Sequence, residues 1–93
     1  MGNVRRFRNA VGPQVRKCRA AANLTQEALT TRLQLSGLDI ERTAIAKIEG
    51  GVRSVFDFEL IAIAKALRVP ATKLFPSDRD YRKALPALLR GYL

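Results

Sequence analysis

The side chains of this sequence with the clearest chemical role are its cations, because the chain contains 17 lysines and arginines and only 8 aspartates and glutamates. Guanidinium and ammonium groups bind anions, and a net charge of +9 on 93 residues creates a positive potential over much of the surface. Such a field favours nucleic acid as the partner first and an anionic membrane surface second. A basic composition can also serve solubility alone, so the charge by itself does not show that the protein binds a polyanion.

The cations are concentrated at the N-terminal end of the chain. The first 26 residues hold no carboxylate, and they contain Arg5, Arg6, Arg8, Arg16, Lys17 and Arg19. Residues 1–10 are polar, basic and aperiodic, which predicts a basic N-terminal arm with a mobile tip.

The residue types in this sequence offer little support for any chemistry other than anion binding. The chain has no histidine and one cysteine, Cys18, so zinc lacks its common ligands and an internal disulfide is excluded. The 8 carboxylates form no visible acid-base or nucleophilic constellation, so we predict neither an enzyme nor a cofactor. A chain without a run of about 18 apolar residues or a signal peptide is expected to be cytoplasmic and to start at Met1.

Two amphipathic helices are predicted first, over residues 13–22 and 25–35. Pro13 suits a first helical position, Asn23 can end the first helix in a left-handed conformation, and Thr25 can cap the second. Their buried stripes are Val11, Val15 and Cys18, followed by Leu24, Leu29 and Leu33.

The next turn is longer than the three or four residues that usually join a helix-turn-helix pair. We interpret residues 36–40 as an extended corner in which Leu38 and Ile40 are buried, and Asp39 as the N-cap of a helix over about 40–49. On that helix Ile45 and Ile48 are expected to be buried, and Arg42, Thr43, Ala46 and Lys47 to face outward.

Gly50 and Gly51 end the third helix, and the segment DFELIAIAKAL, residues 57–67, predicts a fourth. Pro70 opens a short fifth helix, from which Leu74 and Phe75 are expected to pack on the core. These elements close a compact, all-α, five-helix domain over residues 11–75.

Residues 76–93 predict a C-terminal helical appendage that Ser77 can cap. Its apolar series is Tyr81, Leu85, Leu88, Leu89 and Tyr92, interrupted by Pro86. Because a five-helix core needs no further cover, this segment is expected to mediate dimerisation, to strap across the domain, or to remain a weakly ordered tail.

Residues 11–75 resemble the phage repressor and Cro-like (Xre-type) helix-turn-helix family, in a variant with an extended turn before the recognition helix. Three blocks in the family's order carry the resemblance: VRKCRAAANLTQEAL, RTAIAKIEGG and ELIAIAKALRVPATKLF. The resemblance implies a transcriptional regulator, most often a repressor. Such a protein binds double-stranded DNA as a homodimer on a palindromic operator, with the helix at about 40–49 in the major groove.

The resemblance places Arg42, Thr43 and Lys47 at the outward positions of the recognition helix that reach base edges. A helix in the groove presents its first exposed side chains to the bases, and arginine can bond guanine O6 and N7 together. The family's phosphate-clamping glutamine, which also braces the recognition helix, corresponds to Gln26. Arg53, Arg16 and the arginines of the arm are expected to contact phosphates as well. Each of these polar side chains could instead be an ordinary solvated surface residue.

The family's positions for a partly buried ion pair between the first helix and the end of the third are occupied by Arg19 and Glu49. We predict that this pair orients the recognition helix.

Three positions depart from the family. Gly50 lacks the side chain that many members place next to the DNA backbone. Glu41 replaces a hydroxyl cap that bonds phosphate, so its carboxylate is expected to turn away from DNA, to accept from a cytosine amine, or to limit affinity. Phe56 replaces the hydroxyl cap before the fourth helix, which leaves that work to Asp57 or Ser54.

Other function classes remain open from the sequence. An antitoxin or adaptor-type interaction module can use the same fold, with autoregulatory DNA binding and a partner held by residues 76–93. A membrane-surface role for the arm and the tail is the least favoured.

Overall fold

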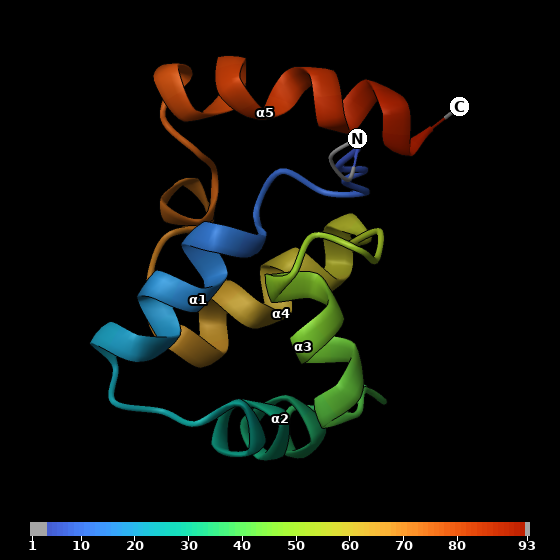
Figure 1. Ribbon diagram of the computed structural model, residues 1–93. Helices are drawn as coiled ribbons and strands as arrows, with labels where there is room; N and C mark the ends of the chain where they lie inside the picture. The colour runs from blue at the N-terminus through green and yellow to red at the C-terminus, as the bar shows by residue number, and fades with distance from the viewer. Residues whose placement is uncertain (1–3, 93) are drawn as a thin grey trace.

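The computed structural model describes residues 4–92, and every regular element among them is helical (Figure 1). Along the chain the elements are α1 (Gly12–Ala21), α2 (Gln26–Leu35), α3 (Arg42–Glu49), α4 (Asp57–Leu67), the 3-10 helix η1 (Ala71–Leu74) and α5 (Asp78–Gly91). The all-α prediction is confirmed, and α1, α2 and α4 lie within one residue of their expected bounds. The expected tip of the arm, residues 1–3, and Leu93 lie outside the described residues. No described helix has the length and apolarity needed to span a membrane.

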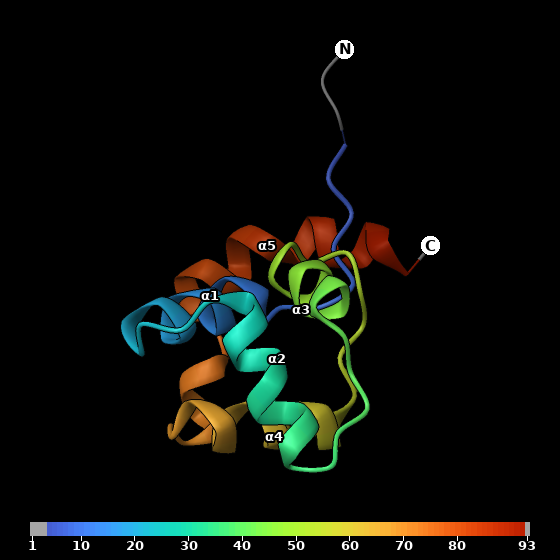
Figure 2. The ribbon, with the colours of Figure 1, turned by 90° about the horizontal axis from the view of Figure 1, so that it is seen from below.

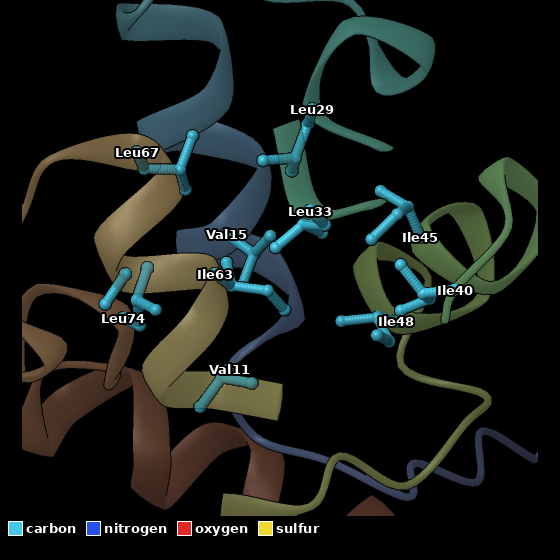
Figure 3. Packing of buried hydrophobic residues seen from close by; sticks show 11 residues of the cluster. Val11, Val15, Leu29, Leu33, Ile40, Ile45, Ile48, Ile63, Leu67 and Leu74 are labelled. Carbon is cyan, nitrogen blue, oxygen red and sulfur yellow. The ribbon is translucent and has the colours of Figure 1, made fainter. Parts of the chain in front are cut away.

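One apolar core joins the first four α-helices and η1 (Figure 3). Its buried members are Val11, Val15, Leu29, Leu33, Ile40, Ile45, Ile48, Ile63, Ala64, Leu67 and Leu74. The apolar spacing predicted most of these residues, because positions three and four apart share one face of a helix. In α3, a helix of 8 residues, Ile45 and Ile48 are buried in the apolar core, and Ala44 packs against it partly buried.

The helices α1 to α4 end in the same way, with a residue of positive φ one or two positions after the last helical residue. These residues are Asn23, Gly37, Gly51 and Arg68. The amide that follows each of them bonds to the carbonyl five residues earlier, as Leu38 does to Leu33 at 3.0 Å. This is the Schellman motif, which satisfies carbonyls that a helix end leaves free. The predicted left-handed end at Asn23 and the glycine stop of α3 are confirmed.

The corner between α2 and α3, residues 36–41, turns its apolar side chains inward. Ile40 is 3% exposed and Leu38 packs half-buried against the core, as expected. The Gln34 side chain donates from Nε2 to the carbonyl oxygen of Ile40 at 2.9 Å. The longer turn is therefore a packed and hydrogen-bonded corner.

The predicted cap of α3 is wrong. The helix begins at Arg42 rather than at residue 40, so Glu41 takes the N-cap position and Asp39 is exposed outside it. Burial of Ile40 keeps this part of the corner out of the helix, which moves the start of α3 two residues along the chain. The Glu41 side chain makes no capping bond.

The start of α4 uses two carboxylates. Phe56 occupies the N-cap position, and its backbone N–H donates to Glu59 at 3.0 Å. Asp57 accepts from the backbone N–H of Phe58 at 2.7 Å, in line with its expected role. Glu59 therefore supplies a bond that the sequence analysis did not assign.

The short element after Pro70 is a 3-10 helix of four residues rather than an α-helix. Leu74 is buried as expected, but the expectation for Phe75 is wrong, because its side chain is 52% exposed. In a 3-10 helix, side chains three residues apart share one side. Ala71 and Leu74 accordingly pack on the core together, and Phe75 does not.

The last helix, α5, crosses one end of the molecule, and the N-terminal segment lies next to it (Figures 1 and 2). Ser77 caps α5 as predicted, since its Oγ accepts from the backbone N–H of Asp80 at 3.1 Å. Residues 5–8 hydrogen-bond to α5, and Arg8 also donates to the carbonyl of Gly51 after α3. The described part of the arm therefore lies between α5 and the loop that follows α3.

Candidate nucleic-acid interface

The outward face of α3 presents the three side chains predicted to read bases. Arg42, Thr43 and Lys47 are exposed, and none of them hydrogen-bonds to another described side chain. Ile45 and Ile48 fix the opposite face in the core with no exposure. Thr43 and Lys47 are one turn apart, so they are neighbours on the helix surface. The outward face of α3 is thus polar, its three side chains form no hydrogen bonds with other described side chains, and the opposite face of the helix is packed in the core.

Cationic side chains from two other segments lie beside α3. Arg8 of the arm and Arg53 of the loop after α3 line one open depression together with Thr43, Lys47 and Ser54. Three positive charges and two hydroxyl donors in one depression suit an anion that carries several oxygen acceptors. Arg8 was expected to contact phosphate, but no spacing in the sequence indicated that it lies beside α3.

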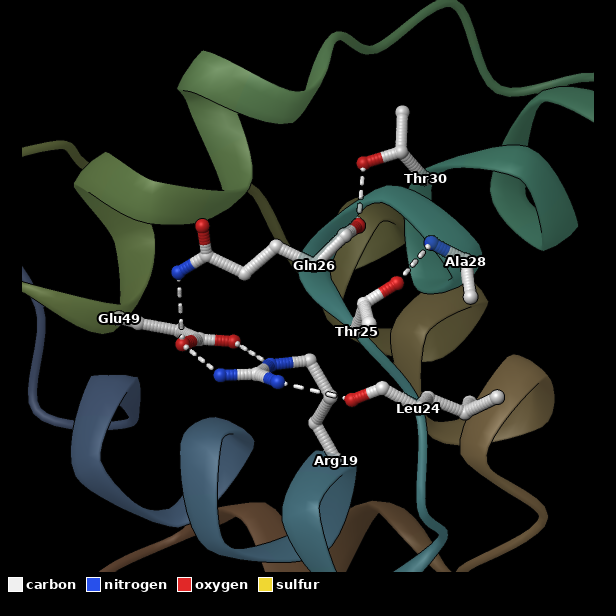
Figure 4. Close-up of polar contacts among 7 residues, drawn as sticks. All are labelled: Arg19, Leu24, Thr25, Gln26, Ala28, Thr30 and Glu49. Carbon is white, nitrogen blue, oxygen red and sulfur yellow. Dashed lines mark hydrogen bonds and ion pairs between the residues drawn. The ribbon is translucent and has the colours of Figure 1, made fainter.

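At the other end of α3, Glu49 joins three helices (Figure 4). Arg19 of α1 donates to its carboxylate from Nε at 2.6 Å and from Nη2 at 2.9 Å. Gln26 of α2 adds a third bond from Nε2 at 3.1 Å. The side chains of Arg19 and Glu49 are 15% and 4% exposed, so the pair predicted from their positions is present and largely buried.

The Arg19 guanidinium is held as a cation by this arrangement. Its hydrogen bond to Glu49 raises the pKa of Arg19 against the opposing effect of burial, and the charge of Glu49 raises it further. Arg19 also donates from Nη1 to the carbonyl of Leu24 at 2.8 Å, just before α2. The network therefore fixes the end of α3 relative to both α1 and α2.

Asn9 is a structural residue that the sequence analysis missed. Its Oδ1 accepts from the backbone N–H groups of Val11 and Gly12 at the start of α1, at 3.1 and 2.8 Å. Its Nδ2 donates to the carbonyls of Ile48 and Arg53, at 3.0 and 2.8 Å. An asparagine shortly before the helix-opening Pro13 was the available signal, because asparagine favours helix starts.

The backbones of α1 and α3 approach closely at this junction. A Cβ added to Gly12 would lie 2.3 Å from the carbonyl oxygen of Ile48. Only glycine fits there, so α1 and the end of α3 form one rigid unit with Asn9.

Arg53 lies in a second ion pair, which the sequence analysis did not predict. It donates to both carboxylate oxygens of Glu59, at 2.9 and 2.8 Å, and its side chain is 29% exposed. The hydrogen bond from Arg53 lowers the pKa of Glu59, burial opposes this, and the backbone N–H of Phe56 lowers it further. A phosphate contact by Arg53 would therefore be made by a guanidinium already bound on one edge.

The remaining predicted contacts lie apart from the depression. Arg16 is exposed on α1, whereas Gln26 is half-buried and directs its amide to Glu49. Glu41 is exposed at the start of α3, next to Arg42. Among residues 4–92, no group of three or more histidine, cysteine or carboxylate side chains is placed to hold a metal ion.

The Arg19–Glu49 pair gives a first prediction. Arg19→Ala should lower the free energy of unfolding by about 2–4 kcal/mol, because it leaves a buried carboxylate without its charged partner. Arg82→Ala is the control, since the pair of Arg82 with Asp78 is solvated and should contribute about 0–1 kcal/mol. Urea denaturation measures both. Equal effects of the two substitutions would contradict a structural role for the buried pair.

Glu59 gives a second prediction, on pH. A lowered folded-state pKa means that the ionised carboxylate stabilises the fold above its unfolded pKa of about 4.3, and that this stability is lost as pH falls through the folded pKa. The difference in unfolding free energy between the wild type and Glu59→Gln should stay constant above about pH 5.5 and shrink in more acidic solution. Glu27→Gln, which removes an exposed carboxylate, controls for the change in net charge. A difference independent of pH between 3 and 6 would refute the assignment.

Comparison with known proteins identifies the architecture. No protein-family model matches the chain, and no curated protein does. Among solved structures, the chain is similar to the restriction-modification controller protein C.AhdI from Aeromonas hydrophila. Sequence identity is 32%, the match covers 70% of this chain and 87% of that one, and the TM-score is 0.61.

Sequence identity and structural overlap of this extent agree with the three sequence blocks and with the arrangement of α1 to α4. The likeness extends over most of the length of the solved protein. The chain belongs to the Xre-type, phage repressor and Cro-like family of helix-turn-helix proteins.

Proposed function

We propose that this protein is a sequence-specific, double-stranded DNA-binding regulator of transcription that inserts α3 into the major groove. The observation that carries the proposal is the asymmetry of α3. Its outward face offers Arg42, Thr43 and Lys47 without intramolecular partners, while its last residue, Glu49, is locked to two other helices. A helix fixed in this way can present side chains to base edges without rearranging. The net charge of +9 supplies the long-range attraction.

The contacts divide by chemistry. Arg42 is suited to bidentate bonding of guanine, and Thr43 to a thymine methyl group or a phosphate. Lys47 and Arg16 carry mobile positive charges that suit a base edge and a phosphate respectively. Gln26, held against Glu49, keeps one amide hydrogen for a phosphate.

Glu41 is the one carboxylate at the DNA-facing start of α3. It repels phosphates, so we propose that it disfavours sequences that bring the backbone close and favours a cytosine whose N4 amine it can bond. The side chain would then contribute to selectivity at a cost in affinity.

We further propose that the regulator is a repressor. Repression requires only that a bound protein occupy a site overlapping a promoter, whereas activation needs an additional contact with the transcription machinery. The likeness to a restriction-modification controller protein favours regulation over catalysis.

Selection of binding sites from random duplex DNA tests the proposal. We expect a preferred sequence with two related half-sites. Arg42→Ala should relax selectivity at one base pair per half-site, at a cost of about 1–3 kcal/mol against the wild-type site. Arg16→Ala should weaken all duplexes alike and reduce the salt slope by about one. Recovery of no preferred sequence, with the two variants indistinguishable, would disprove base readout by α3.

A palindromic operator requires a dimer, and we propose a homodimer formed through α4. Phe56, Phe58 and Ile61 are more than half exposed, and the two phenylalanine rings stack at a centroid distance of 5.6 Å. Asp57 and Lys65 lie at opposite ends of this exposed surface. In an antiparallel pairing of two α4 helices, each Asp57 would face the partner's Lys65 while the apolar side chains between them become buried.

Two substitutions separate this surface from the alternative of dimerisation through α5. Phe58→Asp should convert the protein to a monomer, because it places a charge in the apolar centre of the interface. Leu89→Asp, at a side chain of α5 that is 60% exposed, should leave the dimer intact. Sedimentation velocity at matched concentration measures both. Dissociation by Leu89→Asp but not by Phe58→Asp would assign the interface to α5 instead.

A further inference from the structure

Residues 5–8 are hydrogen-bonded to α5 through their backbone. The N–H of Phe7 donates to the carbonyl of Ala87 at 2.9 Å. The carbonyls of Arg5 and Arg8 accept from Arg90 Nε and from the Tyr92 hydroxyl, each at 2.9 Å. Backbone bonds fix the path of the segment while leaving its arginine side chains exposed.

Glycine at position 91 permits this approach. A Cβ added to Gly91 would lie 1.8 Å from the carbonyl oxygen of Phe7 and 2.7 Å from its carbonyl carbon. Both are backbone atoms, so the arm would have to move away to make room. No rearrangement of a side chain could relieve that clash.

The opposite side of the arm is fixed to the end of α3. Arg8 donates from its backbone N–H to the carbonyl of Gly51 at 2.7 Å. The Phe7 ring, half-buried, packs over Gly51, where a Cβ would lie 3.0 Å from the ring. Gly51 also has a φ of +76°, which suits glycine for a second reason.

The register of these contacts decides where Arg8 lies. With the Phe7 ring over Gly51, the next side chain lines the depression that also contains Thr43, Lys47 and Arg53. Arg53 is already bound to Glu59, whereas no described side chain forms an ion pair with Arg8. Arg8 and Lys47 are therefore the two cations of this depression that form no ion pair among the described residues, and Arg8 is the one that the arm contributes.

We propose that α5 is a positioning element that holds Arg8 beside α3 as a binding site for a DNA backbone phosphate. The inference rests on the proposed DNA binding and assigns α5 a role within one protomer. A free arm would lose conformational freedom on binding, whereas an arm held by Ala87, Gly91 and Tyr92 has lost it during folding. Loss of the α5 contacts should therefore weaken DNA binding even when every arginine is retained.

A mixed-sequence DNA duplex is the probe, because a phosphate contact does not depend on base sequence. The proteins compared are the wild type, Arg8→Ala, Gly91→Ala and the double variant. Losing one phosphate contact lowers the salt slope by about 0.9, which corresponds to roughly eightfold weaker binding at 0.1 M salt. We expect this effect for Arg8→Ala and nearly as much for Gly91→Ala. The double variant should bind no more weakly than Arg8→Ala, because both changes remove the same contact.

Arg79→Ala is the matched control, since it removes one exposed charge from α5 outside the arm contacts. It should change the salt slope far less than Arg8→Ala. Tyr92→Phe removes only the hydroxyl that bonds the Arg8 carbonyl, and it should weaken binding in the same direction by a smaller factor. Circular dichroism and sedimentation velocity establish that each variant keeps its fold and oligomeric state.

Wild-type affinity and salt slope for Gly91→Ala would overturn the inference, as would additive losses in the double variant. A loss of affinity accompanied by dissociation would also overturn it, because α5 would then act through oligomerisation. If Gly91→Ala fails to fold, Tyr92→Phe decides, and unchanged binding by that variant refutes the positioning role. If site selection finds no preferred sequence, this result would count against base readout by α3 but not against the arm contact, because the arm contact is measured on mixed-sequence DNA.

Discussion

Burial of the Glu49 carboxylate is the constraint on which the arrangement of the helices depends. A charge that is 4% exposed is tolerated only where charged and polar donors surround it, and here the donors come from two different helices. Arg19 and Gln26 must therefore stand in fixed positions relative to the end of α3. Because this end is fixed, the direction in which the first turn of α3 leaves the core is fixed too.

The same junction collects the other unusual contacts of the molecule. Gly12 lets α1 approach the last carbonyls of α3, and Asn9 ties the start of α1 to the loop beyond. The polar atoms that two helix ends and a loop would otherwise leave free are bonded to one another. Rigidity is thus concentrated at the C-terminal end of α3, and the side chains at its N-terminal end remain unengaged.

Much of this fold was predictable because its signals are local. Apolar spacing located the core stripes, Thr25 marked the start of α2, and Asn23 marked the end of α1, each within a few residues of the structure it determines. The Arg19–Glu49 pair is 30 residues apart in sequence, and only the family resemblance indicated it. The cap of α3 was mispredicted because burial of Ile40, a tertiary effect, outweighed the capping preference of Asp39. The contact of Phe7 with Gly91 had no local signal at all, since a glycine near a helix end also suits an ordinary stop.

The join between the arm and α5 links the first described residues of the chain with the last. Arg5 and Arg90 are 85 residues apart, whereas α1 to α4 pack through contacts between nearer segments. Closing so long a loop is entropically costly, so this join should form last during folding and open first in the native state. The amides of Phe7 and Arg8 should then exchange with solvent hydrogen through a local opening that leaves the apolar core intact. In this local opening, α1 to α4 stay folded while the cationic arm detaches from α5 and attaches again.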